Sequence, residues 1–318
     1  MMPAPRQRFT PLLPWLLSAL LLALLACAPA KPAAGPDSAQ PESLPAASTL
    51  RAGDVILAWR DLPAPSKHIA ARPLLLVTGF AMSAEGWNRE FVRGLNSGRR
   101  VILMDNRGMG AAADLPAGAP VDMPAMAADA ARLLDVLGIA KADVLGWSMG
   151  GGIALELALA RPERVGALVL YAPPLSGARV KPMLDRMFAM SPAELKEALF
   201  PRQWAAAHPE VWAAMPPPAA IPEGMAARQY AALCSWPGVA ARLPGLRVPA
   251  LFLVGGDDWV CPPLDGRAQA AAVPGARFEL VPQGGHWMMH QNPRELARLV
   301  DAFLRRAPLD PRPGSARD

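Results

Sequence analysis

The sequence is poor in the residues that bind metal ions, nucleotides or nucleic acids. It has only four histidines and three cysteines, and they do not cluster at the spacing of metal ligands. No G-x-G-x-x-G segment follows an expected strand, and no phosphate-binding loop is found. The net charge is only +5, and lysine and arginine form no stripe. We therefore expect no metal, no cofactor and no nucleic-acid partner.

A long apolar run stands near the N-terminus. Arg6 and Arg8 precede it, and it extends from Leu12 to Ala26 with prolines close to its start. Because it is too short to span a bilayer comfortably, it predicts a secretory signal peptide over residues 1–26. The sequence LLAC, which ends at Cys27, resembles a bacterial lipobox, in which the cysteine carries the lipid. We expect an exported protein of the periplasm or outer membrane with a membrane anchor on Cys27, and plain secretion is the alternative.

Three segments follow the signal peptide. Residues 27–49 are rich in proline, alanine and serine without periodicity, which is typical of a tether. Residues 50–306 are long enough to bury the core of one domain, and residues 307–318 are expected to be a flexible tail.

Cys234 and Cys261 either pair in an oxidising compartment or remain buried thiols, and we favour thiols.

Strands and helices alternate along the expected domain. Apolar runs predict strands at 55–59, 74–78, 101–105, 143–145, 165–171, 250–254 and 278–281. Amphipathic segments predict helices at 123–137, 153–161, 264–272 and 292–306. At the last helix, Asn292 would be the N-cap and Glu295 the partner of a capping box. This alternation indicates an α/β fold, with a mostly parallel sheet covered by helices on both faces.

A serine lies between two glycines where an expected strand meets a helix. The segment GWSMGG places Ser148 between Gly146 and Gly150. Such a turn is strained at the serine and crowds the residues two positions away, so glycine fits there. The pattern is that of a nucleophile elbow, which exposes the serine hydroxyl.

A serine nucleophile needs a base, and four histidines are available. His286 follows an expected strand within the loop QGGHW, at the sheet edge where catalytic groups of open α/β sheets gather. His290 is the rival, but no glycine-rich loop precedes it, so we interpret it as a solvated or helix-capping residue. His68 and His208 lie in segments that indicate surface positions. We therefore expect His286 to be the base.

An acid is expected at the end of the strand before the histidine strand, because the order nucleophile, acid, base marks this architecture. The segment GGDDWVCPP follows that strand and contains Asp257 and Asp258. Either aspartate would orient the imidazole, and spacing alone does not choose between them. A polar turn without a catalytic role is the alternative interpretation.

These motifs resemble the α/β-hydrolase family, in particular its small members related to carboxylesterases, cofactor-free haloperoxidases and enol-lactonases. The resemblance covers roughly residues 50–306 and includes the elbow at Ser148, GGDDWVCPP, and QGGHW at His286. The spacing in the family implies Asp258 as the acid. It also implies a helical cap over residues 173–240, a segment that breaks the alternation of strands and helices.

The same resemblance implies an oxyanion hole. Residues 74–80 are similar to the strand and loop that supply the first donor, which implies the backbone N–H of Phe80, with Met149 supplying the second. Residues 105–110 match the D-x-R-G-x-G loop of the family. Many relatives have His-Gly where this chain has Thr78-Gly79, a change that alters how the loop is braced but leaves the backbone donor in place.

The expected activity is that of a serine hydrolase acting on a small or medium-sized apolar carboxylic ester. Methionines and tryptophans of residues 173–240, together with Trp147, Trp287 and Met288, suggest an apolar pocket beside the site. A cofactor-free perhydrolase or haloperoxidase-like enzyme, or a lactonase, would use the same triad. A non-catalytic binding protein of the same fold is a further alternative.

Overall fold

A computed structural model describes residues 43–66, 71–215 and 220–308. The expected signal peptide, Cys27, His68 and most of the tether and tail lie outside these residues. Within the described ranges, no helix is both long and apolar enough to cross a bilayer.

The core of the molecule is an eight-stranded sheet in the order β1-β2-β4-β3-β5-β6-β7-β8. β1 pairs antiparallel with β2 and β2 antiparallel with β4, while every other pair is parallel. The strands are β1 (Ser48–Ala52), β2 (Val55–Leu62), β3 (Leu74–Val77), β4 (Val101–Asp105), β5 (Ala142–Trp147), β6 (Val165–Tyr171), β7 (Ala250–Gly255) and β8 (Arg277–Val281).

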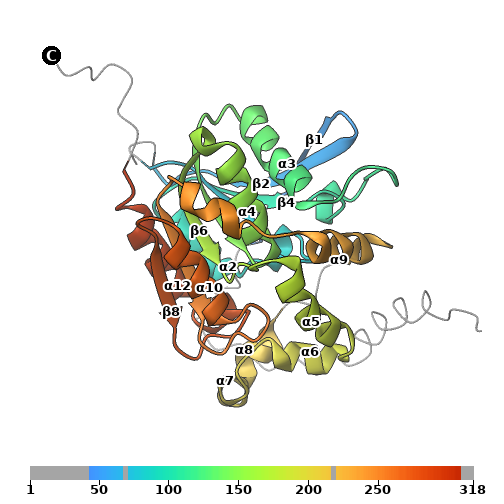
Figure 1. Cartoon of the computed structure of the whole chain (residues 1–318), viewed down its shortest axis with the longest axis vertical. Coiled ribbons are helices and arrows are strands. Elements are labelled where there is room, and N and C mark those ends of the chain that lie inside the picture. Colours follow the sequence, from blue (N-terminus) through green and yellow to red (C-terminus); the bar gives the residue numbers. More distant parts are fainter. Residues whose placement is uncertain (1–42, 67–70, 216–219, 309–318) are drawn as a thin grey trace, which may run out of the picture.

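Helices cover both faces of this sheet (Figure 1). In β3, Leu75 and Val77 face one apolar cluster, and Leu74 and Leu76 face the other, as the two-residue period of a strand requires. The first cluster includes residues of α3 (Met123–Val136), α4 (Met149–Ala160) and α10 (Pro263–Ala272), and the second includes residues of α2 (Arg89–Asn96) and α12 (Pro293–Leu304). The expected α/β fold is therefore confirmed.

Among the described residues between β6 and β7, where a helical cap was expected, there are five α-helices, which we call the cap. They are α5 (Gly177–Phe188), α6 (Pro192–Ala198), α7 (Arg202–Ala207), α8 (Pro209–Ala214) and α9 (Met225–Ser235). Figure 1 shows α5 to α8 gathered away from the helices that cover the sheet. Ser191 and Glu194 form a capping box at the start of α6, which gives that short helix a defined beginning.

The structure differs from expectation at several elements. β1 is exposed and begins at Ser48, inside the expected tether, because pairing with β2 rather than an apolar pattern holds it. α4 begins at Met149 and not at Ile153, since burial of its whole first part outweighs the low helix propensity of three glycines. α2 was not expected at all.

The expected capping box of α12 is wrong. Asn292 is the N-cap, but its side chain makes no capping hydrogen bond. Its carbonyl still accepts the N–H of Leu296 at 3.0 Å. Asn292 is also the C-cap of the short helix α11 (Met288–Gln291). Its backbone therefore caps both helices, while its side chain makes no capping hydrogen bond to α12.

Candidate active site

Ser148 occupies a strained turn between β5 and α4. Its backbone has φ 54° and ψ −123°, a conformation that non-glycine residues rarely adopt. A Cβ atom added at Gly146 would lie 2.1 Å from the carbonyl oxygen of Gly150, and one added at Gly150 would lie 2.2 Å from that of Val77. Both glycines are therefore required by close backbone approach, as the elbow pattern predicts.

Ser148, His286 and Asp258 form a continuous hydrogen-bonded chain. His286 Nε2 lies 3.0 Å from Ser148 Oγ, and His286 Nδ1 lies 2.8 Å from Asp258 Oδ2. The other carboxylate oxygen of Asp258 accepts the N–H groups of Val260 and Cys261, each at 2.9 Å. These two bonds fix the carboxylate, which in turn fixes the imidazole ring.

The structure distinguishes the two adjacent aspartates. Asp258 is 2% exposed and contacts His286, whereas Asp257 is exposed. The N–H of Asp257 donates to the carbonyl of Gly284 at 2.9 Å, so this residue connects the acid loop to the histidine loop through its backbone.

Phe80 and Met149, the expected oxyanion donors, each follow a residue of the serine site, Gly79 and Ser148 respectively. A Cβ atom added at Gly79 would be 3.2 Å from the Cβ of Ser148, so the chain that leads to Phe80 passes directly against the serine. Met149 is the first residue of α4, where amides have no partner within the helix. In the described part of the chain, no backbone acceptor is found for the Phe80 N–H. That these two amides form an oxyanion hole stays a prediction.

Thr78 braces the loop that carries Phe80. Its hydroxyl donates to the carbonyl of Met82 at 3.1 Å, which closes the turn around Phe80. The side-chain amide of Asn106 donates to the carbonyl of Thr78 at 3.1 Å. The threonine at this position therefore provides bracing that links the loop to the segment after β4.

Two buried aromatic residues hold the backbone of His286. The Tyr171 hydroxyl donates to the His286 carbonyl at 3.1 Å and accepts the N–H of Met289 at 3.1 Å. Trp147 Nε1 donates to the same carbonyl at 3.3 Å. Burial raises the pKa of Tyr171 well above its usual range, so the hydroxyl remains a donor. The only sequence signal for this contact is that Tyr171 ends the strand next to the elbow strand.

His290 is buried, so its interpretation as a solvated or capping histidine is wrong. Burial lowers the pKa of His290 to about 4, which keeps the ring neutral. Its Nδ1 lies 3.4 Å from the side-chain amide of Asn88, and the ring packs against Trp287. Asn88, the N-cap of α2, is far from His290 in the sequence, so only the fold brings the two together.

The two described cysteines do not form a disulfide. Cys261 is buried, while Cys234 is partly exposed. Ser148 lowers the pKa of the Cys261 thiol, a smaller influence than burial, and the sequence pattern did not predict these two residues as neighbours. Burial, together with the carboxylates of Asp258 and Asp265, raises the pKa of the Cys261 thiol well above its usual range. The thiol is therefore uncharged beside the serine.

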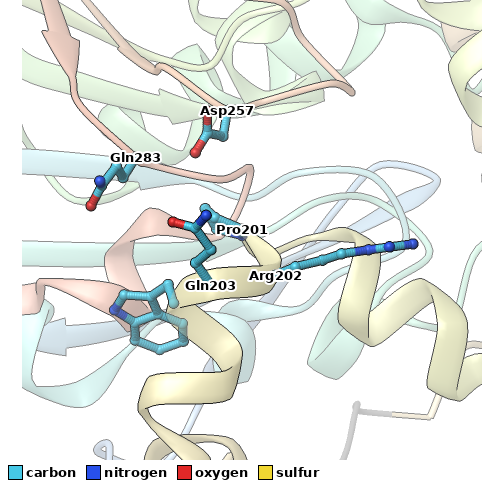
Figure 2. Close-up of a pocket in the computed structure, with 6 residues that line it drawn as sticks. Pro201, Arg202, Gln203, Asp257 and Gln283 are labelled. Atoms are coloured by element: carbon cyan, nitrogen blue, oxygen red, sulfur yellow. The ribbon is translucent and has the colours of Figure 1, made fainter.

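A hollow of about 270 Å³ lies between the start of α7 and the loops after β7 and β8. Figure 2 shows Asp257 and Gln283 on one side of it and the cap residues 201–204 on the other. This hollow does not include Ser148 or His286. Of the residues expected to line an apolar pocket, Trp147 and Met288 are buried in the hydrophobic core. Among the described residues, no cluster of potential metal ligands is found.

Comparison with known proteins agrees with this arrangement. Residues 74–299 match the alpha/beta hydrolase family. The chain is 32% identical over 238 residues to RutD of Azorhizobium caulinodans, whose name gives carbamate hydrolysis as a candidate activity, and the match covers 69% of this chain and 86% of that protein. It is also 31% identical over 254 residues to BpoC of Mycobacterium tuberculosis, which is named as a candidate non-heme bromoperoxidase. That match covers 73% of this chain and 93% of BpoC.

A solved structure supports the same assignment. A thermophilic esterase from Thermogutta terrifontis is 28% identical to this chain with a TM-score of 0.67, and the match covers 80% of this chain and 94% of the esterase. The family match extends over most of the chain. This chain therefore belongs to the α/β-hydrolase family.

Proposed function

We propose that this protein is a serine hydrolase that cleaves a small or medium-sized apolar carboxylic ester. The observation that carries the proposal is the unbroken path from Asp258 Oδ2 through His286 to Ser148 Oγ, with contacts of 2.8 and 3.0 Å. An imidazole held in this way by a buried carboxylate is oriented to take the serine proton.

The reaction would proceed through an acyl-enzyme. Ser148 Oγ attacks the ester carbonyl while His286 Nε2 accepts the proton of the serine hydroxyl. The resulting oxyanion accepts hydrogen bonds from the N–H groups of Phe80 and Met149. His286 then donates the proton to the departing alcohol. A water molecule attacks the acyl group, again with His286 as the base, and the acid and free Ser148 are released.

The surroundings of the site favour an apolar substrate. Ser148 is 8% exposed, and the Phe80 side chain packs edge-on against Phe188 of the cap with ring centroids 5.9 Å apart. Such aromatic groups complement an apolar acyl or alcohol group by burying its surface. The similarity to an esterase is in line with this choice of substrate class.

The direct test is hydrolysis of p-nitrophenyl esters of increasing acyl length by wild-type protein and by Ser148→Ala. We expect the wild type to hydrolyse short and medium esters and to react with a fluorophosphonate probe, and Ser148→Ala to lose both properties. A probe signal that persists in Ser148→Ala, or active wild-type protein that is never labelled, would contradict the assignment of the nucleophile.

A second candidate is perhydrolase or haloperoxidase-like activity with the same triad, favoured by the similarity to BpoC. In that reaction hydrogen peroxide replaces water as the nucleophile that attacks the acyl-enzyme. Measuring peracid formation from acetate or an ester in the presence of peroxide separates the two. A lactone panel extends the test to lactonase activity, and binding without turnover of any compound would favour a non-catalytic role.

Location and partners are part of the proposal. We propose export of the chain and attachment to the bacterial membrane through a lipid on Cys27, with residues 28–49 as the connection to the domain. The support is the arrangement of Arg6, Arg8, the apolar run and LLAC in the sequence. The proposed partner in solution is the small ester substrate alone.

A further inference from the structure

Gln229 reaches from the cap to the loop beside Ser148. It lies on the buried face of α9 with Met225 and Leu233, and it is 0% exposed. Its Oε1 accepts the backbone N–H of Ala81 at 2.8 Å. The two residues are 148 positions apart in the sequence, so only the folded cap brings them together.

Ala81 stands in a conformation that its side chain disfavours. Its φ is +55°, in the left-handed region that alanine rarely adopts. Such a backbone conformation persists only when neighbouring groups hold it. The bond to Gln229 and the bond from Thr78 to Met82 act on the two sides of this turn. Phe80 directly precedes Ala81 and lies between Thr78 and Met82, so both bonds hold the segment that contains it.

The amide of Gln229 is oriented by this contact. Because Ala81 N–H is a donor, the oxygen of the amide must face it and Nε2 must point elsewhere. Nε2 is buried and has no hydrogen-bond partner among the described residues. A buried donor without an acceptor is unfavourable compared with an apolar side chain of similar shape, so Gln229 is a poor choice for packing alone.

We propose that Gln229 is a positioning residue, through which the position of α9 controls the geometry of the oxyanion hole. When α9 is in place, Oε1 holds the Ala81 N–H, the left-handed turn is maintained, and the Phe80 N–H is directed at the oxyanion. When α9 moves away, the turn loses this hydrogen bond, and the Phe80 N–H is no longer directed at the oxyanion. The Phe80 contact with Phe188 of α5 connects the same loop to the cap a second time. This inference rests on the proposed serine hydrolase function.

The test compares Gln229→Met, which removes the acceptor and keeps the length, with Gln229→Glu, which keeps an oxygen in either protonation state. For Gln229→Met we expect kcat to fall by about 10- to 100-fold with little change in KM, because misdirection of one donor acts on the transition state. The affinity of an alkyl boronic acid, whose adduct with Ser148 mimics the tetrahedral intermediate, should fall in parallel. Gln229→Glu should retain most of both.

Arg228→Met is the matched control. Arg228 lies next to Gln229 on α9 and donates to the carbonyl of Ala119, so this variant loosens the helix without touching the loop of Phe80. We expect its kcat and boronic acid affinity to stay within about threefold of wild type. Thermal unfolding of all three variants shows whether a loss is simply one of folding.

Different results would overturn different statements. If folded Gln229→Met keeps the kcat and boronic acid affinity of Arg228→Met, the coupling is wrong. If Gln229→Met and Gln229→Glu are equally impaired, packing and not the Oε1 bond is responsible, which also overturns it. If Gln229→Met does not fold, a folded Gln229→Glu with a large loss of boronic acid affinity overturns it. Failure of the wild type to react with the fluorophosphonate probe would instead overturn the proposed function.

Discussion

Asp257 and Asp258 stand side by side in the chain but have different surroundings. Asp258 contacts His286 Nδ1 and accepts two backbone N–H groups, whereas Asp257 is exposed. We predict that Asp258→Asn lowers kcat by ~10⁴, because the amide favours the wrong tautomer of His286. Asp257→Asn, the matched control, should cost about tenfold or less. Steady-state ester hydrolysis measures both, and a larger loss in Asp257→Asn would reverse the assignment.

Tyr171 is predicted to act on His286 through its backbone. Tyr171→Phe removes the bond to the His286 carbonyl and the acceptor for the Met289 N–H, while Trp147 still holds the carbonyl. We expect kcat to fall about tenfold and the free energy of unfolding to fall by about 1–2 kcal/mol. Kinetics and urea unfolding measure the two effects.

The other tyrosine of the chain supplies the control for this prediction. Tyr230 donates its hydroxyl to Asp185 on the surface of the cap. Tyr230→Phe should therefore lose a hydrogen bond without a change in kcat. Equal kcat values for Tyr171→Phe and Tyr230→Phe would show that the bond to the His286 carbonyl does not influence the site.

His290 predicts a dependence of stability on pH. Its pKa in the folded protein is about 4, below the value of about 6.5 expected for an unfolded chain. The unfolded state therefore binds a proton first as the pH falls, and stability is lost between about pH 6.5 and pH 4. The expected loss from this residue is about 3 kcal/mol.

Urea unfolding at several pH values, in wild type and in His290→Gln, measures this effect as the difference between the two profiles. The variant should lose less stability on acidification than the wild type does. His208→Gln, which changes a partly exposed histidine, is the control. Parallel profiles for wild type and His290→Gln would show that His290 takes up its proton equally in both states.

At the scale of elements, the turn between α6 and α7 is fastened to both loops that carry the triad. Trp259, next to Asp258, donates from Nε1 to the carbonyl of Ala198 at 2.5 Å. The N–H of Trp287, next to His286, donates to the carbonyl of Leu199 at 3.4 Å. Movement of this turn would therefore displace the loop of Asp258 and the loop of His286 together.

Gly285 permits the close approach of the histidine loop to the turn between α6 and α7. A Cβ atom at this position would lie 2.5 Å from the carbonyl oxygen of Leu199 and 3.0 Å from Cδ of Pro201. We predict that Gly285→Ala displaces the α6–α7 turn, costs about 1–3 kcal/mol of stability and lowers kcat. Gly118→Ala, where an added Cβ meets nothing within 4 Å, is the control. Thermal unfolding and ester hydrolysis measure both variants, and equal behaviour would exclude the expected clash.

At the scale of the whole molecule, the prediction concerns where the enzyme is held. If Cys27 carries a lipid, wild-type protein should sediment with membranes, and Cys27→Ser should either appear in the soluble fraction or accumulate unprocessed. Cys234→Ser, which changes a cysteine of the folded domain, should leave the distribution unchanged. Mass spectrometry that finds an unmodified mature N-terminus beyond Cys27 would exclude the lipid anchor in favour of plain secretion.

Local patterns were enough to predict the order of most strands and the strained turn that carries Ser148. The strands at 101–105 and 165–171 have the expected ends, because an apolar run between turn residues is a property of neighbours in the chain. The elbow at Ser148 is likewise local, since the glycines that relieve its crowding lie two positions away. The sequence also placed His286 in a loop after a late strand, where the structure has it, and its role as the base stays a prediction.

Only the tertiary structure decided which side chains meet around that frame. The choice of Asp258 over Asp257 depends on the direction in which each side chain leaves the turn toward a loop 28 residues away. His290 is buried beside Asn88, which is distant in the sequence, and the contact of Gln229 with Ala81 depends on the position of α9. Contacts of this kind join segments distant in sequence, and periodicity carries no information about them, because it records only which face of an element is apolar.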